Sequence, residues 1–140
     1  MLAQNFSVKE KCCYMSAVHA AKTKHKILIV EDEGDLCLLL ELILTDGKTS
    51  IEHVKNLQAA KHFLETEQPN LIVLDNRLPD GLGLDFLPFI KTNYPSVRVI
   101  MISGKDGAVK DLALENGAHI FLTKPFTKDT LHSSVNALLN

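Results

Sequence analysis

Short apolar runs alternate with helix-type patterns along most of this chain, and no other feature restricts the possible folds as strongly. The apolar runs predict strands at residues 27–30, 49–54, 71–75, 97–102 and 119–122. Helix-type spacing follows each run, at residues 35–45, 58–67, 84–93, 108–116 and 128–140. Strands that alternate with helices build right-handed βαβ units. The pattern therefore predicts an α/β fold, a doubly wound five-stranded parallel sheet with helices on both faces.

Turn and cap residues mark the expected ends of several helices. Gly47 and Gly117 follow the first and fourth helix patterns, where a glycine commonly ends a helix. Thr127 precedes the last helix pattern and is expected to cap it. Pro88 falls within the third pattern, so we expect that helix either to bend or to hold the proline in its first turn.

Length and composition indicate one globular domain. The chain has 140 residues, 46% of them hydrophobic, which is enough for a sizeable core. The formal net charge of −2 gives no indication of a nucleic-acid or membrane surface, and the apolar runs are too short to span a bilayer. Residues 26–140 carry the regular pattern. Residues 1–25 predict an N-terminal extension that is either flexible or a short helix.

The cysteines and histidines show no spacing typical of a disulfide framework or a metal site. Cys12 and Cys13 are adjacent, and Cys37 lies within a helix pattern. The six histidines lie in unrelated segments and are expected at or near the surface without a metal role. The N-terminus has no secretory signal pattern, so a reducing cytoplasm is the simplest setting.

Charged and hydroxyl side chains stand at the ends of four predicted strands. Glu31 and Asp32 follow the first strand, Asp75 ends the third, Ser103 follows the fourth and Lys124 follows the fifth. Because the carboxyl ends of parallel strands share one edge of the sheet, we expect these residues to converge. Crowded carboxylates need a neutralising cation, and their oxygens suit Mg²⁺. A lysine and a hydroxyl beside that cation could clamp a phosphoryl group, which an aspartate could attack to form an acyl phosphate.

Each of these residues alone has an ordinary structural explanation. Asp and Ser residues at strand ends commonly cap the next helix, and a lysine before a proline is commonly a solvated loop residue. Their joint placement at four strand ends is much harder to explain by capping.

Residues 26–140 resemble the receiver domain of two-component response regulators. The resemblance rests on the segments KILIVEDE (26–33), LIVLDNRLPDGLG (71–83), VIMISG (99–104) and GAHIFLTKPF (117–126). It implies a flavodoxin-like sheet with strand order 2-1-3-4-5 and a cis peptide bond before Pro125. Asn76 and Arg77 depart from the family pattern, because the first of these positions is often apolar.

The same resemblance implies a role for each residue at the strand ends. These residues are Asp75 (phosphoacceptor and Mg²⁺ ligand), Asp32 and Glu31 (Mg²⁺ ligands, Asp32 more directly), Arg77 (Mg²⁺ ligand through its backbone carbonyl), Lys124 (pairing with the phosphoryl group), Ser103 (switch hydroxyl) and Phe121 (switch aromatic).

The function that this resemblance implies is a phosphoacceptor signalling switch with Mg²⁺ as its cofactor. A histidine kinase or a phosphotransfer protein would donate the phosphoryl group to Asp75. The fourth helix, fifth strand and fifth helix would then change and bind an effector protein or a second copy of the chain. One alternative is a receiver-like protein-binding module that works without phosphorylation. Another is a Mg²⁺-dependent aspartyl phosphatase, but haloacid-dehalogenase-like enzymes need a second carboxylate where this chain has Arg77, so we do not expect a turnover enzyme.

The first helix pattern is apolar nearly all round. Beyond a four-residue core face, Leu38 and Leu42 add a second apolar pair. The resemblance implies that kinases and phosphotransfer proteins dock on the outer side of this helix. Leu38 and Leu42 are therefore candidates for a docking patch or a seat for the N-terminal extension, and scattered surface leucines are the alternative. The expected core face consists of Leu36, Leu39, Leu40 and Ile43.

Overall fold

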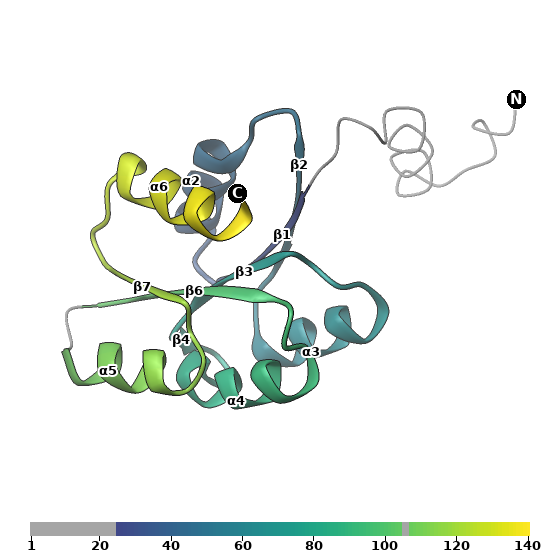
Figure 1. Cartoon of the computed structure of the whole chain (residues 1–140), viewed down its shortest axis with the longest axis vertical. Coiled ribbons are helices and arrows are strands. Elements are labelled where there is room, and N and C mark those ends of the chain that lie inside the picture. The colour runs from purple at the N-terminus through teal and green to yellow at the C-terminus, as the bar shows by residue number, and fades with distance from the viewer. Residues whose placement is uncertain (1–24, 105–106) are drawn as a thin grey trace, which may run out of the picture.

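A five-stranded parallel sheet forms the centre of the computed structural model, which describes residues 25–104 and 107–140 (Figure 1). The strands are β1 (His25–Val30), β2 (Thr49–Val54), β3 (Leu71–Asp75), β6 (Arg98–Ser103) and β7 (Ile120–Thr123). They pair in the order β2-β1-β3-β6-β7, which is the expected order 2-1-3-4-5 when these strands are numbered along the chain. The predicted doubly wound sheet is confirmed.

Helices cover both faces of this sheet. They are α2 (Gly34–Leu44), α3 (Leu57–Thr66), α4 (Gly83–Asn93), α5 (Gly107–Glu115) and α6 (Lys128–Leu139). Figure 1 shows α2 and α6 on one side of the sheet and α3, α4 and α5 on the other. Each side has its own apolar core, because successive side chains of a strand point to opposite faces. In β3, for example, Val73 packs in the core beneath α2 and α6, whereas Ile72 packs in the core beneath α3, α4 and α5.

The helix ends agree with the sequence expectations at two of three positions. Gly117 follows α5 with a positive φ of 120°, and the Thr127 hydroxyl caps α6 by accepting from the Thr130 N–H at 3.0 Å. Gly47 does not end α2, so that expectation was wrong. The chain leaves α2 at Thr45 in an extended conformation, and Gly47, with φ of 77°, belongs to the turn before β2.

Pro88 lies in the second turn of α4, so of the two expected alternatives only a bend of this helix remains. The expected core face of α2 needs correction. The buried stripe of α2 consists of Cys37, Leu40 and Leu44, whereas Leu39 is 47% exposed. The helix therefore faces the sheet through a stripe that the hydrophobic pattern alone did not select, because leucines surround the helix and leave its orientation open.

The segment after Asp75, predicted as a loop, contains a short antiparallel hairpin. Its strands are β4 (Arg77–Leu78) and β5 (Gly81–Leu82). Asp80, in the turn of this hairpin, accepts hydrogen bonds from the backbone N–H groups of Leu57 and Gln58, both at 2.9 Å. These bonds join the hairpin to the start of α3 and lower the pKa of the Asp80 carboxyl. The predicted N-terminal extension falls almost entirely on residues 1–24, outside the described residues.

Candidate functional site

Three carboxylates converge where β1 and β3 end. Glu31 and Asp32 follow the last residue of β1, and Asp75 is the last residue of β3. Each offers one oxygen, and these three oxygens lie within 4.8 Å of one another. Glu31 and Asp75 are buried, whereas Asp32 is exposed. The predicted convergence of these residues at one sheet edge is confirmed.

Lys124 joins the same group from the end of β7. Its Nζ lies 2.7 Å from Asp75 Oδ1 and 3.8 Å from Glu31 Oε1. The Lys124 backbone N–H donates to the Ser103 carbonyl at 2.7 Å, which ties the chain after β7 to the end of β6. The Lys124–Pro125 peptide bond is cis, as expected. The lysine is thus held against Asp75 as an ion pair rather than pointing freely into solvent.

Burial is the main influence on the Glu31 carboxyl. The pKa of Glu31 is raised to about 7, first by burial and then by the neighbouring charges of Asp75 and Asp32. The backbone N–H of Glu33, 3.0 Å from Glu31 Oε2, and the Lys124 ammonium oppose this rise. A single lysine therefore does not neutralise the cluster, and a further positive charge would stabilise it.

The remaining predicted residues lie around this group in different environments. Ser103 is buried at the end of β6, next to the strand that carries Asp75. Phe121 is half-buried in β7 and packs against the core beneath α3, α4 and α5. Arg77 begins β4 two residues beyond Asp75, and its side chain is exposed.

Two residues that support Asp75 were not recognised as such in the sequence. Asn76 is buried and holds the start of α4: its backbone carbonyl accepts from the Gly83 N–H at 2.7 Å, and its Oδ1 accepts from the Leu84 N–H at 2.9 Å. Gly83 lies so close to the end of β3 that a Cβ added to it would be 2.4 Å from the Asp75 carbonyl oxygen. Asn76 thus serves as a structural cap, which explains a polar residue at this position. The one sequence signal for that role was the position of Asn76 shortly before the helix pattern at residues 84–93.

The family of the chain follows from a comparison with known families. The model of the response regulator receiver domain matches residues 27–136. The chain belongs to the receiver domain family. Of the residues whose roles the resemblance implied, this receiver domain brings Glu31, Asp32, Asp75 and Lys124 together at one edge of its sheet.

Curated relatives and solved structures give the same assignment. Response regulator protein PilR of Pseudomonas aeruginosa is 38% identical over 120 residues, which cover 84% of this chain and 26% of PilR. Transcriptional regulatory protein BasR of Escherichia coli is 39% identical over 118 residues, which cover 81% of this chain and 52% of BasR. The beryllofluoride-activated NtrC4 receiver domain dimer is 31% identical with a TM-score of 0.77, covering 81% of this chain and 95% of that one. The receiver domain thus spans about a quarter to a half of these two curated relatives.

The two leucines predicted as a docking patch are exposed on α2. Leu38 is 57% exposed and Leu42 is 68% exposed, both on α2. A groove of about 340 Å³, which neither leucine lines, runs between the start of α2 and the segment that carries Lys124 and Pro125. Leu39, which was expected in the core, lines this groove instead. Among the described residues, no helix is both long and apolar enough to cross a membrane.

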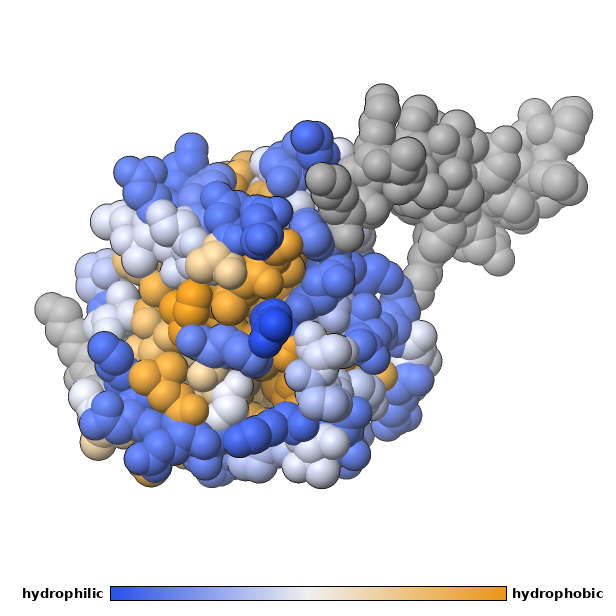
Figure 2. All heavy atoms as spheres, viewed as in Figure 1, coloured by the Kyte–Doolittle hydropathy of each residue, from blue (hydrophilic) through white to orange (hydrophobic). Residues whose placement is uncertain are grey.

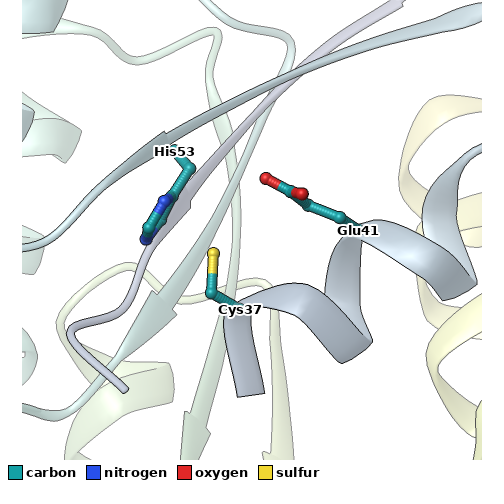
Figure 3. Close-up of side chains that lie close together, drawn as sticks. All are labelled: Cys37, Glu41 and His53. Carbon is teal, nitrogen blue, oxygen red and sulfur yellow. The ribbon is translucent and has the colours of Figure 1, made fainter. Parts of the chain in front are cut away.

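A second group of metal-ligand types lies between α2 and β2. Cys37 and Glu41 on α2 and His53 on β2 each offer one ligand atom, and these atoms lie within 4.8 Å of one another (Figure 3). No metal-ligand spacing in the sequence indicated that Cys37 and His53, which lie in different elements, come close together. The one signal in the sequence was the spacing of four residues between Cys37 and Glu41, which places both on one face of a helix.

Proposed function

We propose that the receiver domain accepts a phosphoryl group on Asp75 from a phosphohistidine of a histidine kinase or a phosphotransfer protein. A carboxylate oxygen of Asp75 would attack phosphorus, the phosphorus–nitrogen bond of the donor would break, and the donor imidazole would leave with a proton. The observation that carries this proposal is the position of the Asp75 carboxylate, buried beside two further acids with Lys124 at 2.7 Å. The ammonium would compensate the charge of the new acyl phosphate.

The cofactor that we propose is Mg²⁺. Glu31, Asp32 and Asp75 offer carboxylate oxygens at the sheet edge, and oxygen is the donor type that Mg²⁺ prefers. The family resemblance adds the backbone carbonyl of Arg77 as a further oxygen ligand. The three carboxylates face one lysine, so the donor set fits a divalent cation. When bound, Mg²⁺ would supply positive charge next to the phosphoryl oxygens.

We propose that phosphorylation changes the surface formed by α5, β7 and α6. The Ser103 hydroxyl would move to donate to a phosphoryl oxygen, and Phe121 would repack in β7, shifting an existing equilibrium between two conformations. Figure 2 shows apolar side chains gathered across the middle of this surface, between α6 and α5. Such a surface suits an effector protein or a second copy of the chain.

The phosphoryl donor protein would dock on the outer face of α2. Leu38 and Leu42 supply exposed apolar area there, and the neighbouring groove leads toward Lys124. A kinase or phosphotransfer protein packed on this face would bring its phosphohistidine to the edge of the sheet that carries Asp75. A near-neutral chain favours such protein partners over nucleic acid, and its cysteine usage favours the cytoplasm.

We further propose that the domain is a switch rather than a turnover enzyme. Arg77 occupies the place where an aspartyl phosphatase needs its second carboxylate. A receiver-like binding module without phosphorylation is the weaker alternative, because the acids, the hydroxyl and the lysine are all present at the site.

Amide NMR with a small phosphodonor tests the proposal. In the presence of Mg²⁺, beryllofluoride or acetyl phosphate should shift the amide signals around Asp75, Ser103, Phe121 and Lys124. The shifts should be lost in Asp75→Asn and retained in Asp111→Asn, which removes an exposed acid on α5.

Two results would contradict this assignment. Phosphate incorporated into Asp75→Asn would place the acceptor elsewhere. A spectrum unchanged by the phosphodonor, in a protein that binds Mg²⁺, would favour the binding module.

A further inference from the structure

Three side chains of different donor chemistry point toward one space between α2 and β2, next to the acidic group but not part of it. Cys37 and Glu41 lie one helical turn apart on the sheet-facing side of α2, and His53 lies on the edge strand β2 (Figure 3). Their nearest ligand atoms, one sulfur, one oxygen and one nitrogen, all lie within 4.8 Å of one another. Unlike a cluster of exposed acids, this set contains a buried sulfur donor and a nitrogen donor.

The imidazole of His53 is already oriented for binding a cation. Its Nε2 lies 2.9 Å from the backbone carbonyl oxygen of Glu31. A carbonyl oxygen can only accept, so Nε2 carries the proton of this hydrogen bond and Nδ1 keeps a free lone pair. Histidine ligands of metals in proteins are commonly held in this way, with the second ring nitrogen donating to a backbone carbonyl.

The other two ligand atoms are the Cys37 sulfur and a Glu41 carboxylate oxygen. Within residues 25–104 and 107–140, neither the Cys37 sulfur nor the Glu41 carboxylate has a hydrogen bond or an ion pair. Cys37 is 3% exposed, whereas Glu41 and His53 are half-buried. Burial, followed by the charges of Glu41 and Glu31, raises the pKa of the Cys37 thiol to about 11, and only Lys55 opposes this rise. A cation would reverse the unfavourable charge at this position.

We propose that Cys37, Glu41 and His53 form a binding site for Zn²⁺. Zn²⁺ accepts sulfur, nitrogen and oxygen ligands together, whereas Mg²⁺ takes oxygens. A thiolate and a carboxylate balance its charge, the neutral imidazole adds a third ligand, and water would complete a tetrahedron. The sulfur–zinc bond forms as the thiol releases its proton to solvent.

The three ligand atoms need to move only a short distance to bind one ion. Two ligands of one Zn²⁺ lie about 3–4 Å apart, since each zinc–ligand bond is about 2.0–2.3 Å long. The ligand atoms now lie within 4.8 Å of one another, and rotation of the half-buried Glu41 and His53 side chains can shorten these separations. The site is separate from the oxygen-only group at the strand ends, although the hydrogen bond from His53 to the Glu31 carbonyl joins the two.

Cobalt spectroscopy of the full chain tests the site. Co²⁺ is added to the Cys12→Ser/Cys13→Ser protein, which keeps only Cys37, with Mg²⁺ in excess to occupy the oxygen-only group. We expect a thiolate-to-cobalt charge-transfer band that saturates at one metal per chain and disappears when Zn²⁺ displaces Co²⁺. Cys37→Ser should abolish the band, and Glu41→Gln or His53→Gln should weaken binding at least about tenfold. The matched control is His62→Gln, an exposed histidine on α3, which should bind as tightly as the parent.

Several outcomes would overturn the proposal. These are the absence of the charge-transfer band, its persistence in Cys37→Ser, and equal metal affinity of the His53→Gln and His62→Gln proteins. Comparing the metal affinities of His53→Gln and His62→Gln tests the site even if Cys37→Ser fails to fold, because both histidines lie outside the fully buried core.

Discussion

Substituting Gly83 by alanine should destabilise the receiver domain, although alanine is the better helix former. The new Cβ would lie 2.4 Å from the Asp75 carbonyl oxygen and 3.0 Å from Leu74 Cγ. Ordinary contacts begin at 3.4 Å, so the start of α4 must move away from β3 by about 1 Å. Neither neighbour gives way easily, because one is backbone and the other belongs to a fully buried side chain.

The size of the effect follows from the contacts at the start of α4. Overpacking costs about 1–3 kcal/mol, and weakening the hydrogen bonds that Asn76 accepts from Gly83 and Leu84 costs about 1 kcal/mol more for each bond. The helix preference for alanine returns up to about 1 kcal/mol. We expect a net loss of about 2–4 kcal/mol in the free energy of unfolding, which lowers the urea midpoint by about 1–2 M.

Urea unfolding followed by circular dichroism measures this change, and Gly34→Ala is the matched control. Gly34 also begins a helix, but a Cβ there would meet nothing within 4 Å. We expect Gly34→Ala to leave stability unchanged or to raise it by up to about 1 kcal/mol. Equal midpoints for the two variants would refute the argument that close backbone approach requires glycine at position 83.

Two further predictions concern the hairpin and the docking face. Asp80→Ala should lower the urea midpoint at neutral pH. Its folded-state pKa is depressed by the Leu57 and Gln58 N–H groups, so the stabilisation holds above the unfolded pKa and is lost as pH falls through the folded value. A deficit that persists unchanged at low pH would contradict this. Leu38→Glu should slow phosphotransfer from a partner protein but leave Mg²⁺ affinity unchanged, with Leu112→Glu on α5 as control. Identical transfer rates for both variants would remove the docking hypothesis.

The fold could be predicted because its main determinants are local and repeated. The continuous apolar runs of β1, β3 and β6 are those of strands covered on both faces, and the alternation with helices allows essentially one handedness of connection. The acidic group could be predicted for the same reason, since a parallel sheet brings its carboxyl ends to one edge. The errors arose where local patterns allow several solutions. Leucines surround α2, so their spacing could not select the stripe of Cys37, Leu40 and Leu44.

The supporting contacts of the site depended on distances that no local pattern contains. Nothing in the spacing of Asp80 indicates that it binds the start of α3, because the partners are more than twenty residues away in sequence. Asn76 and Gly83 illustrate the same limit, since their role depends on how closely α4 approaches β3.

Residue type and spacing therefore determined the order of strands and helices, the convergence of Asp75 with its acidic and basic neighbours, and the family. These depend on properties that each segment carries along its own length, namely side-chain periodicity, turn residues and strand ends. The tertiary structure decided which face of α2 is buried, where the hairpin attaches and that His53 lies beside Cys37 and Glu41. Such contacts join segments whose separation is set by packing of the whole core, and packing couples all the side chains at once.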